Sequence, residues 1–169
     1  MESSPSLIDR NVDINVSCGM STRELPPLPF AATLEVRDAC LCLHVQRAAR
    51  MLARKFDDAL RPLDLTHGQF SLLTSLNRPE PPTISSVANL LAMDRTTLTA
   101  NLKPLDRRKL VKVSVDNEDK RSRRLTITPA GRALLAKAYP IWKKAHVEVE
   151  FLIARGSADD LRAALRALA

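Results

Sequence analysis

The stretch VSVDNEDKRSRRLTIT, residues 113–128, places seven charged residues among nine between two short runs that alternate like β-strands. The runs are LVKVSV (110–115) and RRLTIT (123–128), and apolar residues recur at every second position in each. That alternation is typical of a strand with one buried face. We therefore expect a β-hairpin with a charged, solvated tip. The function of this hairpin is inferred from the segments that precede it in the sequence.

Two short helices are predicted immediately before this hairpin. TISSVANLLAM (83–93) offers Thr83 as its N-cap, and DRTTLTANLKPLDRRKLV (94–111) follows at once with Asp94 in the same role. Two helices joined by a tight turn and followed by a hairpin form a winged helix-turn-helix. A leucine stripe is expected to hold the second helix on the core: Leu98, Leu102 and Leu105.

The first turns of the second helix carry small polar side chains and cations. A helix fits the major groove of B-DNA, and its N-terminal residues reach the base edges. Arginine bonds guanine in a bidentate manner, and threonine offers a hydroxyl to phosphate or a methyl to thymine. The residues predicted to contact DNA from this helix are Arg95, Thr96, Thr97, Thr99, Asn101 and Lys103.

The hairpin is predicted to reach the minor groove beside that helix. Arg121, at the expected tip, suits the negative potential of a narrow A·T-rich groove. Phosphate contacts are expected from the other cations, Lys120, Arg123 and Arg124. Asp116 and Asp119 have two interpretations, as struts that fix the shape of the wing or as ordinary turn formers.

The charge distribution agrees with a polyanionic partner. The 169-residue chain has a net charge of +7, and residues 94–124 alone contribute ten Lys or Arg and five Asp or Glu. A local basic excess attracts nucleic acid, although a solvated basic face without a partner has the same composition. The apolar content of 45%, few aromatic residues and only 4 glycines predict a mainly α fold with an aliphatic core.

Further helices are expected on both sides of this lobe. Asp38 to Leu60 has a helical period, and 66–76 begins with Thr66 and Gln69 at capping-box spacing. A long helix is predicted over 129–153, with a kink near Pro140, and Ser157 with Asp160 begins a last one. Residues on the stripe of the first helix are Leu41, Val45, Ala48, Leu52, Phe56 and Leu60.

Several classes of protein are excluded by what the sequence lacks. It contains no Gly-rich phosphate loop, no HExxH and no GxSxG, so we expect neither an enzyme nor a bound cofactor. Three cysteines without CxxC spacing argue against structural zinc and against a disulfide framework. No secretory signal and no 18-residue apolar run are found, which predicts a cytoplasmic protein.

DNEDKRSRRLTITPAGRALL (116–135) resembles the wing signature of MarR-type transcriptional regulators. That signature is an Asp, a short spacer, Asp-Arg-Arg, a strand and then Leu-Thr-x-x-Gly. Lys120 replaces the usual first Arg and keeps its charge, and Lys109 stands where the family usually has a glycine after the recognition helix. The matching residues are Asp119, Arg121, Leu125, Thr128 and Gly131.

The resemblance implies an obligate homodimer that reads a pseudo-palindromic operator. The apolar stripes agree, because one small lobe could not cover them, although a four-helix core within one monomer is an alternative. The expected divisions are an extended arm at 1–30, a dimerisation helix at 31–62, a winged helix-turn-helix lobe at 63–130 and C-terminal dimerisation helices at 131–169.

Members of the family usually repress, and they release DNA when a ligand or an oxidant changes the spacing of the lobes. The resemblance places an effector pocket where the first helix meets the lobe. The residues expected there are His44, Arg47, His67 and Phe70, each of which has an ordinary surface or core interpretation.

ACLCLHVQRAAR (39–50) resembles the organic-peroxide-sensing branch of the family. Cys42 falls on the reactive cysteine of that branch, eight residues before Arg50, and nearby cations favour a thiolate that forms a sulfenic acid. The alternative is a small, buried, apolar cysteine. The branch bonds its thiolate with tyrosines, whereas the matching positions here are Gln46, Phe56 and His67.

The other cysteines constrain this hypothesis. Cys40 is expected on a different helical face from Cys42, so an intrachain bond between them is not predicted, and a resolving thiol would come from Cys18, a partner chain or a small molecule. The expected partners are thus double-stranded DNA, a second copy, and an effector or oxidant. A peroxide-reactive protein acting through Cys42, and a winged helix used only for protein contact, are the alternatives.

Overall fold

The computed structural model describes residues 27–117, 119–153 and 156–168. The chain divides into two compact units between Cys40 and Leu41. Most of the predicted N-terminal arm, together with Cys18, lies outside the described residues. Among the described helices, none combines the length and the apolar character that crossing a membrane requires.

The first predicted helix is divided in two. Helix α1 spans Phe30–Ala39 and α2 spans Leu41–Leu60, so the prediction of one helix beginning at Asp38 was wrong. Cys40 separates them because its ψ of 105° lies outside the helical region and ends the ladder of hydrogen bonds. No proline or glycine marks this break. It also removes the argument from helical faces against a Cys40–Cys42 bond, because Cys40 is not in the helix of Cys42.

The second unit contains the lobe that the sequence predicted. A short 3₁₀ turn η1 (Arg61–Leu63) leads to α3 (His67–Ser75), followed by α4 (Ile84–Leu90) and α5 (Arg95–Arg107). Hydroxyl and carboxylate N-caps begin these helices, which confirms the predicted starts. The capping residues are Thr66, with its capping box to Gln69, Thr83 and Asp94.

The charged stretch forms the predicted hairpin. Strands β1 (Val111–Val115) and β2 (Arg123–Ile127) pair antiparallel, with Val113 opposite Leu125. Leu125 is fully buried, whereas Val115 at the far end is exposed. The base of the hairpin therefore packs in the core, and its tip extends away from it.

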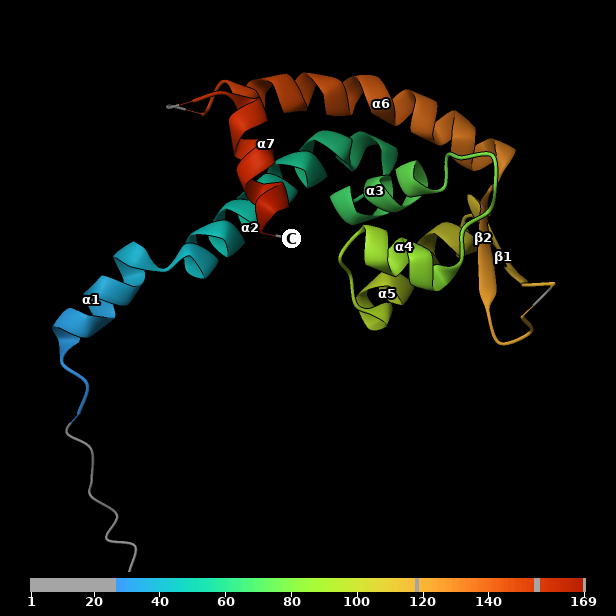
Figure 1. The fold of residues 1–169 in the computed structure, drawn as a ribbon. Coiled ribbons are helices and arrows are strands. Elements are labelled where there is room, and N and C mark those ends of the chain that lie inside the picture. Colours follow the sequence, from blue (N-terminus) through green and yellow to red (C-terminus); the bar gives the residue numbers. More distant parts are fainter. Residues whose placement is uncertain (1–26, 118, 154–155, 169) are drawn as a thin grey trace, which may run out of the picture. The chain divides into compact units, whose positions relative to one another are not determined.

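Two helices complete the second unit. Helix α6 (Pro129–Glu150) begins at the N-cap Thr128 and continues through Pro140 as one helix, and α7 (Ala158–Ala167) begins with a capping box between Ser157 and Asp160. Figure 1 shows α6 running alongside α2 and α3, on the side of α3 away from α4 and α5. The core is aliphatic, as predicted, and contains Leu60, Leu72, Leu73, Leu76, Val87, Leu98, Leu105 and Leu125.

Large apolar side chains nevertheless remain exposed on the helices outside the lobe. In the second unit they belong to α2, to the C-terminal end of α6 and to α7, and the most exposed is Phe151 at 84%. The predicted stripes are thus only half covered within one chain, with Phe56 and Leu60 buried. Leu41, Val45 and Leu52 of the stripe predicted for the first helix are exposed. The full set of exposed large apolar residues on α2 and at the ends of α6 and α7 is Leu41, Val45, Met51, Leu52, Val147, Phe151, Leu152, Leu161, Leu165 and Leu168.

Candidate nucleic-acid interface

Helix α5 has one buried face and one exposed face. Leu98, Leu102 and Leu105 are at most 7% exposed and hold the helix on the core, as predicted. The side chains predicted to contact DNA lie on other faces. Those that are exposed are Arg95, Thr96, Thr97, Thr99 and Lys103.

The first turn of α5 is held by its cap. Oδ1 of Asp94 accepts from the Thr97 amide at 2.8 Å, and Oδ2 accepts from the Thr97 hydroxyl at 2.7 Å. These bonds lower the pKa of Asp94, because they stabilise its carboxylate. The Thr99 hydroxyl donates to the Arg95 carbonyl, whereas Arg95 and Thr96 make no side-chain hydrogen bond or ion pair within the described ranges.

The turn between α4 and α5 is tight for a specific reason. Ala92 has a φ of 48°, a left-handed conformation that is unusual for alanine. The amides of Met93 and Ala92 bond back to the carbonyls of Ala88 and Asn89, which is a Schellman ending of α4. The next residue, Asp94, is the N-cap of α5. The connection is therefore short, and it restricts the angle between α4 and α5.

Asn101 faces the protein as well as solvent. It is half-buried, its amide nitrogen donates to the Thr97 carbonyl at 3.0 Å, and its oxygen lies 2.8 Å from where a Cβ on Gly68 would be. Gly68 is in the first turn of α3, so the absence of a side chain there lets α3 and α5 approach closely. Asn101 therefore helps to set the distance between α3 and α5, in addition to its predicted contact with DNA.

The tip of the wing is organised by two carboxylates. Asp116 is only 4% exposed, and its Oδ1 accepts from the Asp119 amide at 3.1 Å. Asp119 in turn accepts from the Arg121 amide at 2.9 Å, and its carbonyl accepts from the Ser122 amide. These bonds fit both interpretations of the two carboxylates, because they support the loop and also form its turn.

The cations of the wing fall into two groups. Lys120 and Arg121 are exposed, and their side chains make no hydrogen bond or ion pair within the described part of the chain. Arg123 donates to the loop carbonyls of Lys120 and Ser122, both at 3.0 Å. Arg124 is half-buried and two of its donors bond protein groups, so a phosphate contact from its remaining donors stays a prediction. Helix α5 and the far end of the hairpin lie on the side of the lobe away from α6 (Figure 1).

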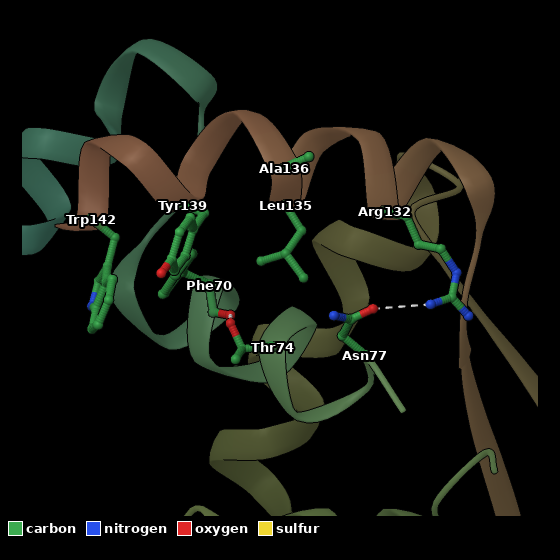
Figure 2. Close-up of a pocket in the computed structure, with 8 residues that line it drawn as sticks. All are labelled: Phe70, Thr74, Asn77, Arg132, Leu135, Ala136, Tyr139 and Trp142. Atoms are coloured by element: carbon green, nitrogen blue, oxygen red, sulfur yellow. Dashed lines mark hydrogen bonds between the residues drawn. The ribbon is translucent and has the colours of Figure 1, made fainter. Parts of the chain in front are cut away.

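A cavity of about 540 Å³ lies between α3 and α6. Figure 2 shows Trp142, Tyr139 and Leu135 of α6 on one side, Phe70 and Thr74 of α3 on the other, and Arg132 bonded to Asn77 at one end. Of the predicted effector residues, Phe70 lines this cavity and His67 lines a second one of about 320 Å³. His44 and Arg47 line neither. The residues of α6 were missed, although Arg132, Leu135, Tyr139 and Trp142 recur at helical spacing.

An aromatic stack adjoins these cavities. Phe56, on α2, stacks on His67 with ring centroids 5.4 Å apart, and Trp142 stacks on His146 at 4.8 Å. Burial lowers the pKa of His67, although the carboxylate of Asp57 opposes this shift. Nδ1 of His67 is buried without a hydrogen-bond partner among the described residues.

The structure places Cys42 on an exposed part of α2. Its Sγ accepts a hydrogen bond from Nε2 of Gln46 at 3.2 Å, and Oε1 of Gln46 accepts from Arg50 at 3.3 Å. Cys42 is therefore not a buried apolar residue within one chain. Gln46 stands at one of the positions where the peroxide-sensing branch has a tyrosine, and it too donates to the sulfur.

The geometry of the lobe agrees with comparisons to known proteins. Residues 65–122 match the MarR family. The structure resembles the crystal structure of the M. tuberculosis transcriptional regulator MosR in complex with DNA, with 38% identity, coverage of 76% of this chain and 92% of the other, and a TM-score of 0.69. The chain belongs to the MarR family. It is therefore a transcriptional regulator with a winged helix-turn-helix DNA-binding fold, and not an enzyme.

Two further MarR relatives bear on regulation. The organic hydroperoxide resistance transcriptional regulator of Bacillus subtilis is 29% identical over 101 residues, which are 60% of this chain and 69% of the relative. Bordetella bronchiseptica BpsR, whose DNA binding is regulated by 6-hydroxynicotinic acid, is 25% identical with a TM-score of 0.67, over 76% of this chain and 97% of BpsR.

Proposed function

We propose that this MarR-family chain is a homodimeric repressor that grips a pseudo-palindromic operator and releases it on binding a small molecule. Each α5 lies in a major groove, and each wing places Arg121 in the adjacent minor groove. The observation that carries this proposal is the exposed edge of α5, where Arg95 and Thr96 make no side-chain hydrogen bond within the described ranges. It is joined by a wing whose Lys120 and Arg121 side chains are exposed and equally unengaged in those ranges. We propose that the repressor works in the cytoplasm, as expected from the sequence.

Dimer formation is supported by the uncovered apolar faces of α2, α6 and α7. Soluble monomers rarely leave a contiguous apolar surface of this kind in water. A two-fold axis through these faces would present two copies of α5 to successive major grooves of one face of DNA.

Binding is tested with the duplex upstream of the protein's own gene. Affinity should fall by orders of magnitude as salt rises, because each phosphate contact releases counterions. Arg121→Ala should lower the salt slope by about one, and Arg95→Ala should weaken the preference for operator over random duplex. Absence of a complex at low salt would end the proposal.

The effector is proposed to occupy the cavity between α3 and α6. Its aromatic walls suit a planar ring, and Arg132 at one end suits an acidic oxygen. Regulation of BpsR by a hydroxynicotinic acid points to the same chemical class. A ligand wedged there would displace α3, and α3 packs on α5 through Gly68 and Asn101.

Filling that cavity is the corresponding test. Leu135→Trp should leave operator affinity unchanged but abolish release by small aromatic acids, measured by fluorescence anisotropy. Thr126→Val, away from the cavity on the wing, is the control and should respond to the acids like wild type. Equal release from Leu135→Trp would place the effector elsewhere.

Oxidation of Cys42 is the second candidate signal, favoured by the Gln46–Cys42 hydrogen bond. The thiolate attacks the peroxide oxygen, so ROOH and Cys42–SH give Cys42–SOH and ROH. Cumene hydroperoxide should release the operator from wild type but not from Cys42→Ser. Consumption of one peroxide per thiol indicates a sensor, whereas repeated turnover with a reductant would indicate the alternative of a peroxide-consuming protein.

A further inference from the structure

Arg124 lies at the junction between the wing and the start of the helix-turn-helix. Its Nε donates to Oδ2 of Asp116, and its Nη1 donates to the Pro81 carbonyl at 3.0 Å. Pro81 belongs to the connection between α3 and α4, 43 residues away in sequence. One guanidinium therefore joins the stem of the wing to the segment that leads into α4.

The same junction is reinforced by backbone contacts. The Leu125 amide donates to the Pro82 carbonyl at 2.9 Å, and Thr83 forms a β-bridge with Arg124. Thr83 is also the N-cap of α4, accepting from the Ser86 amide at 3.1 Å. The wing and the first helix of the helix-turn-helix thus share one attachment.

From Arg124 the connection continues to the tip of the wing. Asp116, bonded to Arg124, accepts from the Asp119 amide, and Asp119 accepts from the Arg121 amide. An isolated two-stranded hairpin is marginally stable and twists freely. A buried carboxylate paired with arginine removes that freedom, because breaking the pair would leave a charge uncompensated in the protein.

We propose that Arg124 is a positioning residue, which orients the wing relative to α4 and α5 through Asp116 and the Pro81 carbonyl and so aims Arg121 at the minor groove. The orientation of the wing by Arg124 is independent of the proposed function, whereas its effect on operator affinity rests on that function. Arg123, the neighbouring cation on the same strand, bonds only loop carbonyls among the described residues and has no such role.

A double-mutant cycle on operator DNA separates positioning from direct contact. Arg124→Gln should weaken binding about tenfold or more when Arg121 is present, but less than twofold in an Arg121→Ala background, because Arg124 acts through Arg121. The matched control, Arg123→Gln, should give effects that add to those of Arg121→Ala. If the losses of operator affinity for Arg124→Gln and Arg121→Ala are additive, the proposal is overturned, and Arg124 contacts a phosphate directly.

Amide hydrogen exchange tests the same inference without DNA. Arg124→Gln should speed exchange at the Asp119 and Arg121 amides more than Arg123→Gln does, because Arg123→Gln removes only the bonds to the Lys120 and Ser122 carbonyls. If Arg124→Gln unfolds, the double variant Asp116→Asn/Arg124→Gln is used in its place in both measurements. The double variant leaves no uncompensated buried carboxylate. Unchanged exchange in a folded variant would refute the positioning role, whereas failure of wild type to bind DNA would refute only the proposed function.

Discussion

Lys109 adopts a backbone conformation that normally belongs to glycine. Its φ is 57°, and the amides of Leu110 and Lys109 bond back to the carbonyls of Leu105 and Asp106, which forms a Schellman ending of α5. The sequence showed that the family's glycine is replaced here, and the helix does end without one. The left-handed geometry is nevertheless kept, because the buried Leu110 must turn back onto the core.

Lys109→Gly should therefore stabilise the protein. A side chain in the left-handed region costs free energy that glycine avoids, and part of this gain is offset by the greater freedom of glycine in the unfolded chain. We expect a net gain of roughly 0.5–1 kcal/mol in the free energy of unfolding, measured by urea denaturation. Arg107→Gly, two residues earlier and within α5, should lower the free energy of unfolding. A loss of stability in Lys109→Gly would contradict the account.

His67 should make stability depend on pH below neutrality. Burial lowers the pKa of His67 in the folded protein, so the unfolded chain takes up a proton first. Stability is therefore fully present above the ordinary histidine pKa of about 6.5 and falls as pH drops below it. Urea denaturation at pH 7.5 and 5.5 should show a smaller loss in His67→Gln than in wild type, and identical losses would exclude this cause.

For single residues, exposure could be predicted from the sequence, but side-chain partners could not. The exposed positions of Arg95, Lys120 and Arg121 follow from helical period and from the charged loop. The partner of Arg124 does not, because spacing along a strand cannot tell which of several adjacent cations faces a buried carboxylate. The inward contact of Asn101 depends on Gly68, and nothing in a helical pattern indicates that two distant positions approach so closely.

At the scale of elements, α6 is fixed by a glycine in its first turn. A Cβ on Gly131 would collide with the Leu110 carbonyl oxygen, which is backbone and cannot swing away. The same carbonyl accepts from the Thr128 amide at 3.0 Å. The start of α6 is therefore seated on the junction between α5 and β1, so a family signature glycine has a direct steric explanation.

Gly131→Ala should destabilise the fold by roughly 1–3 kcal/mol, as overpacking does. Alanine ordinarily stabilises a helix relative to glycine, so the reversed sign identifies the collision as the cause. Thermal unfolding of Gly68→Ala is the matched control, because its nearest neighbour is the Asn101 side chain, which can rotate. A smaller loss in Gly131→Ala than in Gly68→Ala would show that α6 tolerates displacement.

The elements themselves were largely predictable because their ends carry chemical signals. Hydroxyl and carboxylate caps at Thr66, Thr83, Asp94 and Ser157 begin helices as expected, and alternation located both strands. The break at Cys40 was not predictable, since strong helix formers surround it. The cavity between α3 and α6 was also missed, because it arises from how two helices pack rather than from either one.

At the scale of the whole molecule, one chain leaves apolar side chains of α2, α6 and α7 exposed that do not pack into its own core. Arg162 of α7 bonds Glu150 at the end of α6 at 2.8 Å, and it also bonds Asp159 within α7 at 2.7 Å. The hydrogen bond from Arg162 lowers the pKa of Glu150, because it stabilises the carboxylate. The leucines of α7, Leu161, Leu165 and Leu168, are exposed in one chain, which favours a second copy as the group that covers them.

Leu165→Asp should break the dimer. A carboxylate placed in an apolar interface loses its hydration without gaining a partner, so association should weaken sharply. Sedimentation equilibrium should report a dimer for wild type and for the control Ala163→Asp, on another face of α7, but a monomer for Leu165→Asp. Operator affinity should fall with it, because a monomer grips only one half-site. A dimeric Leu165→Asp would show that α7 lies outside the interface, and a monomeric wild type would refute the homodimer itself.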